Sequence, residues 1–144
     1  SSDVCSSDLY YESFFQKLLC YEKLSIKFKD LIIDYSFSGN DLVDNYNKFK
    51  ICKCQRPALA IIDFDMGKNT ITGVDTAKKL RKSGFTGFII LRTSETKEHI
   101  INIHNEFDSL LEKEVINHFV QKSNPDETKS TLQSFMERLF QKAL

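Results

Sequence analysis

The chain has 144 residues, of which 41% are hydrophobic, and its 20 basic residues balance its 20 acidic ones. This length and composition predict one folded domain with one core and exclude an intrinsically disordered chain. The balanced charge gives no reason to expect binding to nucleic acid, and no apolar stretch approaches the roughly 20 residues of a membrane-spanning helix. The four cysteines form no disulfide or zinc pattern, since Cys52 and Cys54 lack a second pair, which favours reduced thiols in the cytoplasm.

The first nine residues differ from the rest of the chain. The segment 1–9 has no initiator methionine and shows neither helical nor strand periodicity. Its sequence from Asp3 to Leu9 is also what a common sequencing adapter gives when it is translated. We therefore interpret 1–9 as a non-native scar and expect the domain to occupy 10–144.

A helix, a strand and a second helix are predicted next. Apolar residues recur with helical spacing in 10–24, and the run 31–35 predicts a strand that contains Asp34. If 31–35 were the first strand, a helix, a strand and a second helix would have to fit between Asp34 and Asp63. Only about 29 residues separate the two acids, which is too few, so 31–35 is interpreted as the second strand. Ser38, Gly39 and Asn40 are expected to cap a helix over 41–53.

Three later strands each end near a residue suited to chemistry. The expected strands are the apolar runs 58–62 and 88–91 and the segment 117–120, whose last two residues, Phe119 and Val120, are apolar. They end at Asp63, at Thr93 and Ser94, and at Lys122, respectively. Continuous apolar runs are typical of buried parallel strands, whose carboxyl ends share the edge of the sheet where open α/β proteins bind ligands. A carboxylate, a hydroxyl and an ammonium at adjacent strand ends predict a phosphoryl-accepting site.

Helices are predicted between and after these strands. Gly73 leads a helix over 73–81, and a fourth helical region covers 95–114. Pro125 and the acids after it are expected to begin the last helix. Its buried stripe is predicted to consist of Leu132, Phe135, Met136, Leu139, Phe140 and Ala143.

From about Tyr10 onward, the order, type and spacing of these features resemble the receiver domain of two-component response regulators. The resemblance implies a flavodoxin-like, doubly wound α/β fold with a parallel five-stranded sheet in the order 2-1-3-4-5, whose first strand is damaged or missing here. It implies that Asp63 accepts the phosphoryl group, that Thr93 hydrogen-bonds it and that Lys122 pairs with its charge. Phe119 corresponds to the aromatic residue that turns inward when Thr93 moves toward the phosphoryl group, so Thr93 and Phe119 would form the switch.

The resemblance also implies Mg²⁺ as the cofactor. Asp63 would supply one oxygen ligand, and the backbone carbonyl of Asp65 another. The paired acids of the family's first strand align with Ser6 and Ser7, which leaves Asp8 as the nearest acid. The metal site is therefore expected to be damaged.

Some positions depart from the family pattern. Ser123 and Gly67 stand where the family normally has prolines, and Asp65 adds a second carboxylate near the acceptor. These departures, with the damaged first strand, leave open a pseudo-receiver that binds a partner without phosphorylation. Taken singly, the site residues also have simpler roles: Asp63 as a turn residue, Thr93 and Ser94 as helix caps, and Lys122 as a surface lysine.

A second alternative is a haloacid-dehalogenase-like phosphatase, because the order of Asp63, Phe64 and Asp65 also resembles its nucleophile and acid pair. That family needs a Thr or Val where Gly67 stands and paired acids after a later strand. The three histidines lack metal-ligand spacing and are expected at the surface or partly buried. They are His99, His104 and His118.

The sequence thus predicts a receiver domain that takes a phosphoryl group onto Asp63 and switches a partner-binding face. Its expected partners are a histidine kinase or a histidine phosphotransfer domain. Two settings stay open: a stand-alone regulator, or a receiver in a longer chain that carries an output domain or the kinase core of a hybrid histidine kinase. No contact with nucleic acid or membrane is expected. Its only predicted enzymatic activities are self-phosphorylation from a donor and autodephosphorylation.

Overall fold

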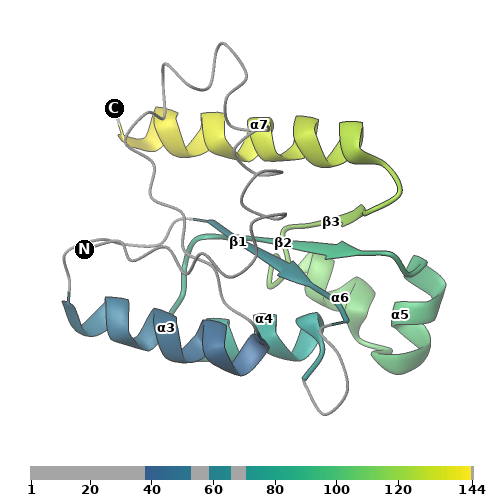
Figure 1. Cartoon of the computed structure of the whole chain (residues 1–144), viewed down its shortest axis with the longest axis horizontal. Coiled ribbons are helices and arrows are strands. Elements are labelled where there is room, and N and C mark those ends of the chain that lie inside the picture. Colours follow the sequence, from purple (N-terminus) through teal and green to yellow (C-terminus); the bar gives the residue numbers. More distant parts are fainter. Residues whose placement is uncertain (1–37, 53–58, 66–70, 144) are drawn as a thin grey trace. The chain divides into compact units, whose positions relative to one another are not determined.

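The computed structural model describes residues 38–52, 59–65 and 71–143, and the segments predicted at 1–9, 10–24 and 31–35 lie outside these ranges. The described residues form five helices and three strands (Figure 1). In chain order they are α3 (Gly39–Cys52), β1 (Leu59–Asp63), α4 (Gly73–Lys82), β2 (Phe88–Thr93), α5 (Lys97–Ile103), α6 (Phe107–Glu112), β3 (His118–Gln121) and α7 (Pro125–Ala143). The chain divides into two compact units, Phe37–Thr128 and a second made of Ser1–Ser36 with Lys129–Leu144.

The three strands form a parallel sheet in the order β1-β2-β3 (Figure 1). Asp63 of β1 is aligned with Arg92 of β2, and Thr93 of β2 with Gln121 of β3. Each strand lies where the sequence predicted one, and the α/β class is confirmed. These are the last three strands of the expected five, in the expected sequence of neighbours. The other two fall outside the described residues.

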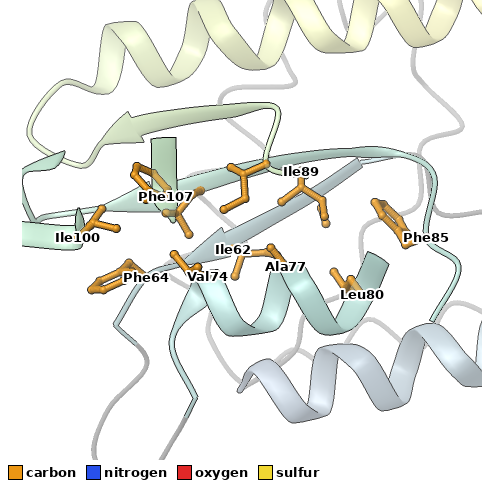
Figure 2. Close-up of a cluster of buried hydrophobic side chains, with 12 residues drawn as sticks. Ile62, Phe64, Val74, Ala77, Leu80, Phe85, Ile89, Ile100 and Phe107 are labelled. Atoms are coloured by element: carbon orange, nitrogen blue, oxygen red, sulfur yellow. The ribbon is translucent and has the colours of Figure 1, made fainter. Parts of the chain in front are cut away.

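The hydrophobic core covers one face of this sheet (Figure 2). Ile62 and Leu91 point to this face because alternate strand residues share a side. Helix α4 packs on it through the buried residues Val74, Ala77 and Leu80, and α3 lies against α4. The buried cluster consists of Ala60, Ile62, Phe64, Val74, Ala77, Leu80, Phe85, Ile89, Leu91, Ile100, Phe107 and Ile116.

Helix α4 ends in a motif that its sequence specifies. Gly84 has a φ of 99°, a left-handed conformation that glycine adopts without strain. Its N–H donates to the Arg81 carbonyl at 3.0 Å, and the Phe85 N–H donates to the Leu80 carbonyl at 3.1 Å. Leu80 and Phe85 are both in the core, so the closing hydrogen bonds and the hydrophobic contact stop the helix together.

The region 95–114, predicted as helical, is divided between two short helices, α5 and α6. The division occurs at His104, whose φ of −124° and ψ of 89° are not helical. Its imidazole turns inward to Thr72, which lies before α4, with Nε2 2.9 Å from the Thr72 Oγ1. His104 is therefore buried, more so than the sequence suggested. A long-range polar contact, which periodicity does not reveal, decides where α5 ends.

Helix α7 begins as predicted, with the Asn124 side chain accepting the Glu127 N–H at 3.1 Å. Leu132 and Phe135 of the predicted stripe are buried. The side chains of Met136, Leu139, Phe140 and Ala143 lie outside the described part of the chain. Among the described helices, none combines the length and the apolar character that crossing a membrane requires.

Arg81, on α4, ties together the loops that precede β2 and β3. Its three guanidinium nitrogens all donate hydrogen bonds, at 2.8 to 3.3 Å. The acceptors are the carbonyls of Phe85, Gly87, Glu114 and Val115 and the Oδ1 of Asn117. Burial lowers the pKa of Arg81, and the charge of Glu114 opposes that shift. The planar fork thus holds the amino ends of two neighbouring strands.

Replacing Arg81 with lysine should destabilise the domain by about 2–4 kcal/mol, because one ammonium cannot reach the acceptors in both loops and leaves part-buried oxygens without donors. Urea unfolding followed by circular dichroism measures the change. Lys82→Arg, at an exposed position of the same helix, is the control and should stay within about 0.5 kcal/mol of the parent. Equal midpoints for Arg81→Lys and the parent would show that the fork contributes nothing.

Candidate functional site

The carboxyl ends of the three strands meet at one edge of the sheet and are joined there by backbone hydrogen bonds. The Phe64 N–H, just after β1, donates to the Arg92 carbonyl at 3.0 Å. The Lys122 N–H, just after β3, donates to the Thr93 carbonyl at 2.7 Å. The ladder therefore continues one residue beyond β1 and β3 and fixes the backbone at the predicted site residues.

Asp63 and Lys122, predicted from the sequence to share a site, are brought together. The Lys122 Nζ lies 3.4 Å from the Asp63 Oδ2, although the two residues come from strands that are not neighbours. The side chains are 26% exposed for Asp63 and 30% exposed for Lys122. Opposite charges at this distance attract more strongly where water is partly excluded than at an open surface. The pair is still accessible to a ligand from solvent.

Thr93 lies at the end of β2, between the strands that carry Asp63 and Lys122. It is 2% exposed, and its Oγ1 accepts the Glu95 N–H at 2.8 Å. The hydroxyl proton is not used in that bond, so the side chain keeps a donor. Thr93 does not cap α5: that role belongs to Thr96, whose Oγ1 accepts the His99 N–H at 3.2 Å.

Arg92 is a residue of this edge that the sequence did not single out. Its Cα is the register partner of Asp63, so the two side chains leave the same face of the sheet on adjacent strands. Neighbouring strands are about 4.8 Å apart. Asp63 therefore contacts Lys122 and is aligned with Arg92 on the neighbouring strand.

Gly73 explains how α4 can begin next to Asp63. A Cβ on Gly73 would overlap the Asp63 carbonyl oxygen and lie 2.6 Å from the Leu91 Cδ1. The Gly73 N–H donates to the Phe64 carbonyl at 2.8 Å. Thr72 caps the helix, its Oγ1 accepting the Asp75 N–H at 3.2 Å. The amino end of α4, which carries a partial positive charge, thus abuts the end of β1.

Of the residues expected to bind Mg²⁺, only Asp63 and Asp65 lie within the described residues. Asp63 supplies one half-buried carboxylate and Asp65, two residues on, is exposed. Magnesium in phosphoryl-transfer sites takes one or two carboxylates together with phosphate oxygens and water. In 38–52, 59–65 and 71–143 no three His, Cys, Asp or Glu side chains form a metal cluster. Asp8 lies outside those residues, and so do Ser6 and Ser7.

Phe119 of β3, the predicted switch aromatic, packs against the core face of the sheet. Its ring meets that of Phe107 edge to face, with centroids 5.9 Å apart and an interplanar angle of 86°. Phe107 is the first residue of α6 and is fully buried. A change in the packing of Phe119 would therefore displace Phe107 and the start of α6 first.

Comparison with solved structures places this architecture in a known class. The chain is similar to a signal receiver domain, from a Vibrio parahaemolyticus protein described as a Luxo repressor, with a TM-score of 0.51 and 17% identity over 88% of this chain and 84% of that one. It is also similar to a fusion that carries a trimeric coiled-coil segment of yeast Spc42, with a TM-score of 0.59 and 18% identity over 96% of this chain and 72% of that one. Neither a protein-family model nor a curated protein sequence matches the chain. The fold is receiver-like.

Gly73→Ala should destabilise the domain by about 1–3 kcal/mol, because its Cβ must displace either the Asp63 carbonyl or the Leu91 side chain. Thermal unfolding measures the loss, and the amide signals of Phe64 should move. The control is Lys79→Ala, at an exposed site of the same helix. A gain in stability, as glycine-to-alanine changes give at ordinary helix positions, would contradict the close approach.

Proposed function

We propose that this domain is a phosphoacceptor receiver, which takes a phosphoryl group onto Asp63 from a histidine kinase or a histidine phosphotransfer domain. The observation that carries the proposal is the contact between Asp63 and Lys122 across β2, at the carboxyl edge of a receiver-like sheet. An acid at an open edge can act as a nucleophile, and an ammonium beside it can accept an oxyanion. The buried Thr93 hydroxyl on the strand between them supplies a neutral donor.

The reaction requires an Asp63 oxygen to attack phosphorus. The phosphorus–nitrogen bond of the phosphohistidine breaks, its electron pair stays on the imidazole nitrogen, and that nitrogen takes a proton from solvent water. The acyl phosphate formed carries about −1.5 to −2 charges, by analogy with other phosphorylated residues. Lys122 offsets this charge as a compact cation, and the Thr93 hydroxyl donates to a phosphoryl oxygen.

Magnesium is part of the same proposal. The Asp63 carboxylate and the backbone carbonyl of Asp65 would hold it, and the site would be weakened because Ser6 and Ser7 stand where the family has its paired acids. Carboxylate and carbonyl oxygens are the hard donors that Mg²⁺ prefers. When bound, the ion supplies positive charge that offsets repulsion between the carboxylate and the incoming phosphoryl oxygens. Such a domain would act in the cytoplasm, either as a stand-alone regulator or beside an output domain or kinase core in a longer chain.

The acceptor is tested by treating the protein with acetyl phosphate and Mg²⁺ and trapping the acyl phosphate with borohydride. Mass spectrometry should locate the modification on Asp63, and removing Mg²⁺ with a chelator should reduce it at least tenfold. Asp63→Asn should abolish it, whereas the matched variant Asp65→Asn should retain it.

Three outcomes would contradict the proposal. Label on Asp65 would refute the acceptor. An absence of label, with the fold intact, would favour a pseudo-receiver that binds its partner without phosphorylation. Continuous turnover of a simple phosphomonoester would favour the haloacid-dehalogenase-like phosphatase.

Lys122→Ala is expected to leave the fold intact, because a partly exposed lysine contributes little packing. It should nevertheless uncouple the phosphoryl group from the rest of the domain. Amide NMR of the beryllofluoride-activated parent should show shifts that reach Phe119 and Phe107, where the two rings are in contact. In the variant these distant shifts should shrink at least threefold. Shifts confined to the neighbourhood of Asp63 in the parent itself would mean that Thr93 and Phe119 do not form a switch.

A further inference from the structure

We propose that His104 is a positioning residue that couples the acceptor end of β1 to the paired helices α5 and α6. The proposal rests on the proposed function for what Asp63 carries, but the coupling itself is a property of the contacts described below. Through His104, a change at Asp63 would reach helices α5 and α6 without involving Thr93 or Phe119.

The imidazole of His104 contacts both segments that flank the acceptor. Its Nε2 lies 2.9 Å from the Thr72 Oγ1, and its ring stands edge to face against Phe64, with centroids 6.1 Å apart. Phe64 directly follows Asp63 in sequence. Thr72 directly precedes Gly73, whose backbone packs on the Asp63 carbonyl. A displacement of the Asp63 backbone would therefore reach the His104 ring both through Phe64 and through Thr72.

The backbone of His104 forms the junction between the two helices. Its N–H donates to the Ile100 carbonyl at 2.7 Å, the last bond of α5. Its carbonyl accepts the Phe107 N–H at 3.1 Å, at the start of α6. Ile100 and Phe107 are fully buried, so the junction is anchored to the core on both sides (Figure 2). A displacement of the ring that carries the His104 backbone with it would tilt one helix relative to the other.

Polar partners fix the orientation of this ring. The Thr72 hydroxyl accepts the Asp75 N–H, so its own proton is available to donate to the His104 Nε2. The Nδ1 then faces the Glu106 Oε1, at 3.8 Å. Lys78 of α4 donates to that same carboxylate oxygen at 2.6 Å, and this bond lowers the pKa of Glu106.

The hydrogen bonds of the imidazole distinguish a ring that couples Thr72 to the helix junction from a ring that only fills the space between them. A phenyl ring at position 104 is planar like the imidazole, although larger, and could still pack on Phe64. It would have no polar atom to hold Thr72, so the amino end of α4 could move without moving the helix junction. Because the side chain of His104 is only 10% exposed, water cannot easily replace the lost bond.

The experiment compares His104→Phe, which keeps the ring, with His104→Gln, whose amide reaches the position of Nε2. A second pair changes the partner: Thr72→Val removes the hydroxyl and Thr72→Ser keeps it. In each background, amide NMR records how far Asp63→Asn shifts the signals of residues 100–107. The parent, His104→Gln and Thr72→Ser should show the full effect. His104→Phe and Thr72→Val should reduce it at least threefold.

Asp108→Asn is the matched control, since it breaks the exposed ion pair that joins α5 to α6 through Lys97, at 2.8 Å, without touching the ring. It should leave the shifts at 100–107 within a factor of about 1.5 of the parent. Unreduced shifts in both His104→Phe and Thr72→Val would overturn the proposal. This readout needs no phosphorylation, so a failure of Asp63 to become labelled would refute the proposed function and leave the coupling to be judged on its own data.

Discussion

The in-register parallel pairing of β1, β2 and β3 is the constraint on which the site depends. It brings Asp63, Thr93 and Lys122 to one edge, although about 60 residues separate the first from the last. Parallel strands need crossover helices, so α4 must start beside the end of β1. Gly73 permits that start at a distance no other residue allows. The position of Asp63 is therefore set by backbone contacts on either side, and the charged side chains act on a prearranged acid.

The charges at this edge favour an anionic ligand. Asp63 is half-buried between a contacting lysine, an arginine aligned with it and the amino end of α4. Each of these stabilises negative charge, and partial burial strengthens all three relative to open solvent. The arrangement suits an acid that gains further negative charge, as an acyl phosphate does. The Asp63–Lys122 pair alone would be an unremarkable ion pair; what distinguishes it is its place at the carboxyl edge of the sheet, where open α/β proteins bind ligands.

Much of the fold and part of the site could be predicted because their signals are local. Apolar runs mark the strands, Asn124 and Pro125 mark the start of α7, and strand ends mark Asp63 and Lys122. The residues that were missed act through distant partners. Arg81 binds loops up to 36 residues away, and His104 meets Thr72 across 32 residues. Neither contact produces a periodic pattern in the sequence. The contact between His104 and Thr72 explains why the region 95–114 is divided into two helices. Arg92 was hidden inside an apolar strand, where only the register shows which residue it faces.

The two polar anchors hold opposite ends of the sheet with different stiffness. At the amino ends, the Arg81 fork makes five hydrogen bonds to two loops. At the carboxyl ends, His104 holds Thr72 by one bond and meets Glu106 only at 3.8 Å. A domain that changes shape needs a rigid frame and a segment of lower local stability. Because the firm anchor lies away from Asp63 and the weaker one beside it, rearrangement costs least where a ligand would arrive.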